Sequence, residues 1–249
     1  MEKQLEGKVA IITGASERIG SAVAQRFAKE GVLLILVAKD INKLNAVYDS
    51  IQELGGDAIL APVDLEDFDT IKDFAMSIEN RFKSIDILIL NAAVLGNLSP
   101  VQDYEYSTWN RIMNINFTAN WYLIKCFDPL LKLSPAGRII ATTSEITQSL
   151  SNYPYWSPYA SSKAALETMM KIYATETKHS KLCINMVYPS LIDSGIYVKA
   201  FPTKDTPESL LPESFTDKFV ELSSSQCNVT GQVYQLPSTV EDKPTTNYV

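Results

Sequence analysis

Short, uninterrupted apolar runs alternate with longer segments of helical spacing along almost the whole chain. The first run, 9–13, is followed by a segment in which Ile19, Val23 and Phe27 recur every four residues, and the alternation continues to residue 236. Strands that are apolar on both faces and are separated by helices are typical of a parallel sheet covered on both sides. The expected fold is therefore α/β, with a doubly wound parallel sheet of about seven strands.

The pattern also gives the expected elements. Strands are expected at 9–13, 32–38, 58–63, 85–90, 138–142, 182–187 and 232–236. Helices are expected at 19–30, 41–54, 67–82, 107–132, 158–178 and 212–222. No repeat, low-complexity tract or linker precedes the polar tail at 238–249, so a single domain spanning residues 1–249 is the economical interpretation.

Charge and composition narrow the class of partner. The formal net charge of −7 disfavours nucleic acid or an anionic membrane surface, because either would favour a basic face, so a small-molecule partner is expected. Residues 1–8 are polar and precede a short apolar run, which is typical neither of a signal peptide nor of a membrane-spanning helix. The 3 cysteines are far apart in the chain. We therefore expect reduced thiols and a cytoplasmic location.

Several polar or turn-forming residues come directly after expected strands. In doubly wound sheets, ligands bind beyond the carboxyl ends of the strands. The residues in such positions are Gly14, Asp64, Asn91, Ser144 and Pro189. We expect them to gather along one edge of the sheet.

The first strand-to-helix turn, from Thr13 to Gly20, is a candidate phosphate site. Backbone N–H groups and the dipole of the following helix favour a pyrophosphate there. Gly14 permits a tight turn, and Gly20 permits close packing of helix on sheet. The P-loop of nucleotide hydrolases is excluded, because it requires a lysine where Ser21 stands. On this pattern alone, an ordinary strand-to-helix turn remains the alternative.

Tyr159 and Lys163 are four residues apart in the expected helix 158–178, so they share one helix face. A phenol titrates near 10, so proton transfer at neutral pH needs a pKa shift of about 3 units, or about 4 kcal/mol. One ammonium at about 4 Å in a partly solvated site could supply ~4 kcal/mol. The pair is thus a candidate for proton transfer, and a solvated helix face is the alternative, because bare Tyr-x-x-x-Lys matches are frequent.

Together, these motifs resemble the classical short-chain dehydrogenase/reductase family from residue 7 to about residue 236. The family's glycine loop, Thr-Gly-x-x-x-Gly-x-Gly, is matched at Thr13, Gly14 and Gly20, with Arg18 at the middle glycine as in pteridine reductases. The chain looks closest to a bacterial subgroup of poorly characterised oxidoreductases. The resemblance implies a Rossmann-type fold and hydride transfer between a nicotinamide cofactor and a carbonyl or alcohol substrate.

The family's catalytic tetrad matches Asn116, Ser144, Tyr159 and Lys163. By resemblance, Tyr159 is the general acid in carbonyl reduction and Ser144 hydrogen-bonds the substrate oxygen. Lys163 is implied to lower the pKa of Tyr159 and to hold the nicotinamide ribose. Asn116 is implied to anchor the water chain that resupplies the proton, with Asn114 as its rival two residues earlier.

The segment between Ser144 and Tyr159 is slightly longer than is usual in the family. Tyr153 and Tyr155 are rivals of Tyr159, but neither has a lysine four residues later. The extra length, at 152–156, is expected to add an aromatic wall to the substrate cleft. Surface packing or a subunit contact is the alternative.

The end of the second expected strand bears on the choice of cofactor. Ala38 stands where an acidic residue would bind the ribose hydroxyls of NAD, and Lys39 follows it. Lys39 and Arg18 favour NADP(H) over NAD(H), whereas Glu17 opposes it. Asp40 is expected to cap the next helix. The implied cofactor contacts are Gly14, Ser16, Arg18, Ile19, Gly20, Lys39, Asp64, Leu65, Asn91, Ala92, Tyr159, Lys163, Pro189, Ile192 and Ser194.

The resemblance also implies a substrate lid at about 193–211 and a homodimer or homotetramer paired through the two long helices. The alternative function is a non-catalytic nucleotide-binding regulatory or scaffold protein that keeps the fold. Arg18, Ala93 and Ser190 motivate it because they stand at three of the family's glycine positions, whereas the complete tetrad opposes it. With His179 as the sole histidine, neither a serine-hydrolase triad nor a metal site is expected.

Overall fold

The computed structural model describes residues 3–189, 195–200 and 211–236. The strands are β1 (Val9–Thr13), β2 (Leu33–Ala38), β3 (Ala58–Pro62), β4 (Ile87–Leu90), β5 (Arg138–Thr142), β6 (Cys183–Pro189) and β7 (Val233–Leu236). They pair in parallel in one sheet with the order β3-β2-β1-β4-β5-β6-β7. The predicted doubly wound sheet is confirmed, and its winding reverses between β1 and β4, where a ligand crevice is expected.

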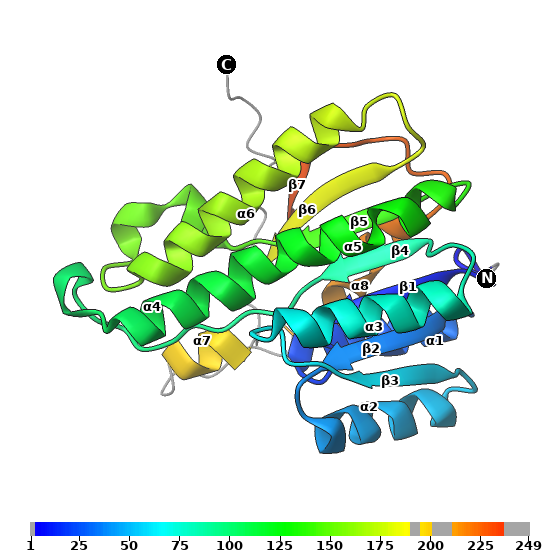
Figure 1. The fold of residues 1–249 in the computed structure, drawn as a ribbon, viewed down its shortest axis with the longest axis horizontal. Helices are drawn as coiled ribbons and strands as arrows, with labels where there is room; N and C mark the ends of the chain where they lie inside the picture. The colour runs from blue at the N-terminus through cyan, green and yellow to red at the C-terminus, as the bar shows by residue number, and fades with distance from the viewer. Residues whose placement is uncertain (1–2, 190–194, 201–210, 237–249) are drawn as a thin grey trace.

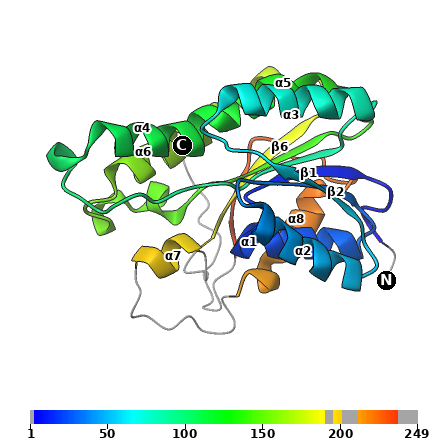
Figure 2. The same ribbon diagram turned by 60° about the horizontal axis from the view of Figure 1, so that its bottom comes forward.

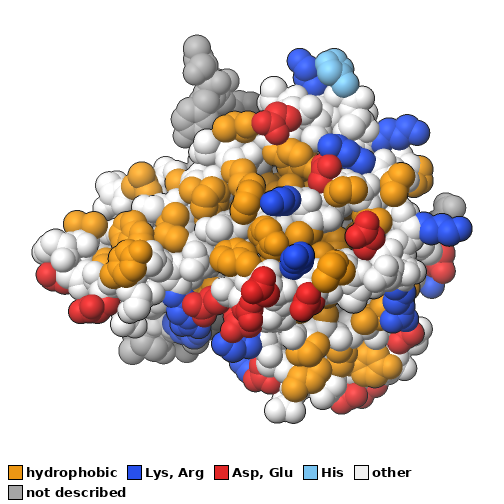
Figure 3. Space-filling model, in the orientation of Figure 1, with side chains coloured by type: hydrophobic (Ala, Val, Ile, Leu, Met, Phe, Trp, Pro, Cys, Tyr) orange, Lys and Arg blue, Asp and Glu red, His pale blue; other side chains and the backbone are white. Residues whose placement is uncertain are grey.

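Two layers of helices cover the sheet (Figures 1 and 2). One face carries α1 (Arg18–Lys29), α2 (Ile41–Glu53) and α8 (Thr216–Ser223), and the other carries α3 (Phe68–Arg81), α4 (Tyr106–Met113), α5 (Ala119–Leu133) and α6 (Ser157–Glu176). The short helix α7 (Gly195–Ala200) lies apart from both layers (Figure 2). Apolar side chains gather on the outer surface of α5 and α6 (Figure 3). Among the described residues, no helix is both long and apolar enough to cross a bilayer.

The sheet separates two apolar cores. Ile12 packs with Phe27 of α1 on one side, whereas its neighbour Ile11 belongs to the core that contains Phe127 of α5. All four side chains are fully buried. Successive residues of a strand point to opposite faces, so a strand that is buried on both faces must be apolar throughout. This explains the uninterrupted apolar runs.

The long helix expected at 107–132 is not continuous. It is divided into α4, a π-helical turn at Asn114–Thr118, and α5. A π turn inserts one extra residue into the helical register. Here the π turn accompanies the burial of Asn116. The side-chain Oδ1 of Asn116 accepts a hydrogen bond from the backbone N–H of Val94 at 2.8 Å, and its N–H₂ donates to the Val94 carbonyl oxygen at 2.9 Å. This tertiary contact was not visible in the spacing of apolar residues.

Aspartate side chains cap the N-termini of α2 and α3, and the cap on α2 is the predicted one. Asp40 caps α2, and its Oδ1 accepts hydrogen bonds from the backbone N–H groups of Asn42 and Lys43 at 2.9 and 3.3 Å. Asp67 caps α3 in the same way, at 3.0 and 3.1 Å. A side-chain oxygen at this position satisfies N–H groups that have no partner within the helix.

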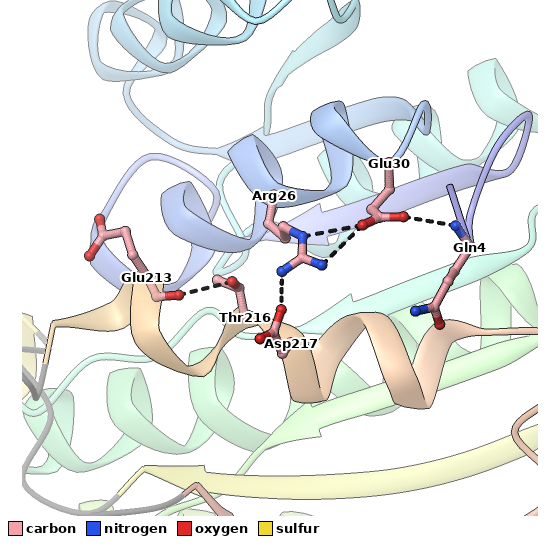
Figure 4. Close-up of polar contacts among 6 residues, drawn as sticks. All are labelled: Gln4, Arg26, Glu30, Glu213, Thr216 and Asp217. Atoms are coloured by element: carbon pink, nitrogen blue, oxygen red, sulfur yellow. Dashed lines mark hydrogen bonds and ion pairs between the residues drawn. The ribbon is translucent and has the colours of Figure 1, made fainter. Parts of the chain in front are cut away.

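A polar cluster fixes α1 against α8 and the N-terminal segment (Figure 4). Arg26 of α1 forms an ion pair with Asp217 of α8 and another with Glu30, at 3.0 Å. The second carboxylate oxygen of Glu30 accepts a hydrogen bond from the backbone N–H of Gln4 at 2.8 Å. The cluster therefore joins the N-terminal segment and α8 to α1, the helix that follows Gly14.

Candidate active site

A cavity of about 280 Å³ lies beyond the carboxyl ends of the strands. Twelve residues of the expected cofactor set line it, from the end of β2 to α6: Gly14, Ser16, Arg18, Ile19, Lys39, Asp64, Leu65, Asn91, Ala92, Tyr159, Lys163 and Pro189. Gly20, also in that set, does not line the cavity but lies close to Gly14 at the end of the turn from Thr13 to Gly20. Ile192 and Ser194 lie outside the described residues, as do the tail and most of the expected lid.

The glycine turn has the close packing that its sequence predicts. A Cβ at Gly20 would lie 2.1 Å from the carbonyl oxygen of Gly14, and a Cβ at Gly14 would lie 2.9 Å from Cα of Ala92. Gly14 and Arg18 have φ values of 64° and 39°, so Arg18 takes up a left-handed conformation that favours glycine. Glu17, the N-cap of α1, makes no side-chain capping bond. The first-turn N–H groups of α1 therefore suit an anionic phosphate.

Asn91 serves mainly to join three strand ends. Its side-chain N–H₂ lies 3.3 Å from the carbonyl oxygens of both Thr13 and Gly14, and its Oδ1 accepts a hydrogen bond from the Thr142 hydroxyl at 3.3 Å. The Thr13 hydroxyl in turn accepts from the backbone N–H groups of Asn91 and Ala92, at 3.0 and 3.1 Å. These bonds hold β1, β4 and β5 in register beneath the cavity.

Charged side chains surround the β2–β3 end of the cavity. Lys39 pairs with Asp64 at 2.5 Å, and Glu17 pairs with Lys43 at 2.5 Å. The hydrogen bond to Asp64 raises the pKa of Lys39. Burial alone would raise the pKa of Asp64, but the bonds from Lys39 and from the backbone N–H of Glu66 outweigh it and lower the pKa. The negative charge of Glu17 disfavours the extra phosphate of NADP(H), but the ion pair with Lys43 balances this charge.

At the other end, α6 brings Tyr159 and Lys163 together. Both side chains are buried, with 5% and 2% of their surface exposed, and Tyr159 hydrogen-bonds to Ser144. Lys163 Nζ donates to the carbonyl oxygen of Thr142 at 2.8 Å and lies 5.9 Å from the centre of the Tyr159 ring. The predicted one-turn spacing on a shared helix face is therefore present.

Burial shifts the pKa values of Tyr159 and Lys163 in the directions that favour the neutral form of each side chain. It raises the pKa of Tyr159 to about 12, against an opposing effect of the hydrogen bond to Ser144, and it lowers the pKa of Lys163 to about 8. For Tyr159, this is the reverse of the direction that the family resemblance implied. The reason is that desolvation of the phenol outweighs the hydrogen bond to Ser144.

Asn116 lies behind the cavity and does not line it. Its fully buried amide donates to Ser162 of α6 at 3.0 Å, in addition to its two bonds with Val94. Its backbone carbonyl accepts a hydrogen bond from the Asn120 side chain at 2.7 Å. In the structure, Asn116 connects the loop after β4 to α6, a role that its position in the sequence does not reveal.

An apolar cluster lies beside Tyr159. The rings of Tyr153, Trp156 and Tyr159 contact one another edge to face, with centroid distances of 5.6 and 5.7 Å. Ile196 and Ala200 of α7 pack against the same cluster. Tyr153 and Trp156 of the extra segment therefore pack beside Tyr159, but neither lines the cavity, so an aromatic wall of the substrate cleft stays a prediction.

The third aromatic residue of that segment, Tyr155, is 55% exposed and has a φ value of 72°. Its carbonyl oxygen accepts a hydrogen bond from the backbone N–H of Ser99 at 3.2 Å and lies 2.6 Å from the hydroxyl of Tyr104. The extra segment is thus joined to the loop that precedes α4.

Two charged residues that line the cavity at its β3 end, Glu66 and Arg111, were not anticipated from the sequence. Ile196 and Lys199 of α7 also line the cavity, and they lie within the segment 193–211 where a lid was expected. Glu66 and Arg111 come together only through the tertiary fold. Their positions carry no motif that could have marked them.

The family model for short chain dehydrogenase matches residues 8–205. An uncharacterized oxidoreductase of Escherichia coli K12, YciK, is 30% identical over 217 residues, which cover 84% of each chain. A fatty acyl-CoA reductase of Acinetobacter baylyi is 31% identical over 224 residues, covering 88% of this chain and 73% of that protein.

Solved structures resemble the fold closely. A short chain dehydrogenase from Salmonella enterica serovar Typhi has a TM-score of 0.88 at 26% identity, covering 96% of this chain and 99% of that chain. A protein from Shigella flexneri 2a, described as a short chain dehydrogenase and complexed with NADP, has a TM-score of 0.87 at 27% identity. That match covers 95% of this chain and 99% of the other.

Proposed function

Because this chain belongs to the short chain dehydrogenase family of NAD(P)-dependent oxidoreductases, which act on CH–OH and C=O groups, we propose that it uses NADP(H) and that Tyr159 transfers the proton. The observation that carries the proposal is that Tyr159, which hydrogen-bonds to Ser144, and Lys163 line a cavity that also reaches an uncapped helix N-terminus. Ser144 itself does not line the cavity.

The residues around the cavity fit a nicotinamide dinucleotide. The first turn of α1 offers N–H groups to a pyrophosphate, and Gly20 lets the helix start approach the turn. Lys39 lies at the end of β2, where an additional ribose phosphate would be bound. Lys43 balances the charge of Glu17. The NADP complex of the Shigella flexneri protein supports the same cofactor.

When bound, NADPH supplies the hydride for carbonyl reduction. Negative charge then develops on the substrate oxygen, which Tyr159 protonates and Ser144 stabilises by a hydrogen bond. A phenol whose pKa is about 12 is fully protonated at neutral pH, which suits the role of general acid in the reductive direction. Lys163, held by the Thr142 carbonyl, lies where it can bind the nicotinamide ribose.

The proposal is tested with the Tyr159→Phe variant. Reduction of ketones, aldehydes, quinones and acyl thioesters is followed by NADPH absorbance, and NADPH binding is measured separately by calorimetry. For the substrates that the wild type reduces, we expect turnover to fall by about 10²–10⁴-fold, while NADPH still binds.

Tyr48→Phe on α2 is the control, since Tyr48 does not line the cavity. Full activity of Tyr159→Phe would remove Tyr159 from the mechanism. If the wild type bound NADPH but reduced no compound in the panel, the non-catalytic alternative would gain support.

We also propose that the protein forms a homodimer or homotetramer and is located in the cytoplasm. A groove between α5 and α6 is lined by apolar residues, including Phe117, Ile124 and Met169, and by charged ones such as Lys125 and Asp128. Apolar surface of this kind suits a homodimer or homotetramer paired through these helices (Figure 3). The 3 cysteines are free thiols, which supports a cytoplasmic location.

A further inference from the structure

The short helix α7 brings to the cavity a lysine that has no role in the mechanism above. Ile196 and Lys199 of α7 both line the cavity. Ile196 and Ala200, one turn apart, pack against the apolar cluster that contains Tyr159. Residues three or four apart lie on one side of a helix, so Lys199 borders the same end of the cavity as Tyr159.

The ammonium group of Lys199 is available to a ligand. Its side chain is exposed, and within residues 3–189, 195–200 and 211–236 it forms neither a hydrogen bond nor an ion pair. The carboxylates that line the described part of the cavity lie at its β2–β3 end, where their ion pairs are with other cations. Lys199 therefore keeps all three of its N–H groups for a molecule in the cavity.

Apolar side chains line the cavity around this lysine. Leu95 belongs to the cluster that contains Tyr159, and Ala93 and Ile196 pack against that cluster. An ionised group is costly to bring into apolar surroundings unless an opposite charge meets it. Among the described lining residues, no carboxylate lies at this end, so a cationic substrate would lack a partner here, whereas an anionic one would find Lys199.

We propose that Lys199 binds an anionic group of the substrate, so that the protein reduces carbonyl compounds that carry a carboxylate or a phosphate. The ammonium donates to the anionic oxygens, and hydrogen bonds between ionised partners are stronger than neutral ones. The carbonyl of the same molecule lies at Tyr159. The phosphates of the cofactor have other proposed sites, at the first turn of α1 and at Lys39, so they do not account for Lys199. This inference rests on the proposed function.

The test compares each anionic carbonyl compound with a neutral counterpart. The probes are pyruvate, acetoacetate and levulinate with their methyl esters, and dihydroxyacetone phosphate with dihydroxyacetone. NADPH absorbance gives kcat/KM for both members of a pair, and their ratio is the anion preference. Because the two members differ in intrinsic reactivity, the decisive quantity is the change in this ratio between wild type and variant, in which that difference cancels.

For the pairs that the wild type reduces, Lys199→Ala should lower the anion preference about tenfold, mainly by raising KM for the anionic member. Lys199→Arg should keep most of the preference, because a guanidinium also binds carboxylate and phosphate. Lys72→Ala is the matched control, since Lys72 is an exposed lysine of α3 outside the cavity, and it should keep the wild-type preference. Circular dichroism and thermal unfolding establish that each variant is folded.

An unchanged preference in Lys199→Ala, or reduction of neutral compounds alone by the wild type, would overturn this inference and leave the proposed function standing. If Lys199→Ala weakened NADPH binding by the same factor in calorimetry, the anion would belong to the cofactor, and the assignment to the substrate would be overturned. Binding of NADPH without reduction of any compound would overturn the proposed function and this inference with it. The wild-type preference should also fall as salt is added, which tests the contact without a substitution.

Discussion

The buried Lys163 makes a specific prediction about stability that does not depend on catalysis. Lysine in an unfolded chain titrates near 10.4, whereas burial lowers the pKa of Lys163 to about 8. Between these two values the unfolded chain binds one more proton than the folded chain, so the free energy of unfolding rises with pH. The contribution of Lys163 to stability is complete above the pKa of lysine in the unfolded chain. It is lost as the pH falls from that value through the pKa of Lys163 in the folded chain.

Integrating this difference from about pH 7 to about pH 9.5 gives a gain of about 2 kcal/mol from Lys163 alone. Lys163→Met removes the titrating group and keeps a side chain of similar length. The change in unfolding free energy between the two pH values should therefore be about 2 kcal/mol smaller in the variant than in the wild type. Other groups that titrate in this range are common to both proteins, so their effects cancel in the comparison.

The measurement is urea denaturation of the ligand-free protein at both pH values, with a reductant present to keep the cysteines reduced. Lys171→Met is the control, because Lys171 lies on the same helix but is half exposed and pairs with Glu167 at 2.7 Å. It should show the wild-type dependence on pH. If Lys163→Met also kept the full wild-type dependence, Lys163 would not be desolvated as the structure indicates, and the argument from burial would be refuted.

Two further predictions follow from the cofactor end and from the outer helices. Lys39→Ala should weaken NADPH binding about tenfold and NADH binding much less, because only NADPH carries the phosphate that Lys39 would bind; equal losses measured by calorimetry would contradict this role. Trp121→Glu places a charge in the groove between α5 and α6, where Trp121 is 47% exposed. It should shift the assembly toward monomers in light scattering, and an unchanged mass would argue against pairing through these helices.

The alternation of apolar runs and helical patterns was enough to predict the sheet. The bounds of β1 and β5 agree with expectation at Val9–Thr13 and Arg138–Thr142, because strands buried on both faces leave a clear signal. The interruption of the long helix could not be predicted. It is linked to the contact between Asn116 and Val94, which are 22 residues apart.

In the candidate site, too, local relations were predictable from the sequence, whereas tertiary contacts were not. Tyr159 and Lys163 were predictable because their relation is local to one helix. The pairing of Glu66 with Arg111 was not, since the residues lie 45 positions apart and meet only after the sheet has formed. The direction of the Tyr159 pKa shift was also out of reach, because burial is a property of the folded molecule.

The contact between the extra segment and the loop before α4 has a practical consequence for redesign. The groups proposed for proton transfer come from helix α6 and the segment just after β5, whereas the aromatic side chains beside them come from the extra segment, which is joined at Tyr155 to the loop before α4. Replacing one loop alone would remove partners from the Tyr155 carbonyl. Segments 97–104 and 145–156 should therefore be grafted as a matched pair, which would let a new specificity be installed without moving the reacting groups.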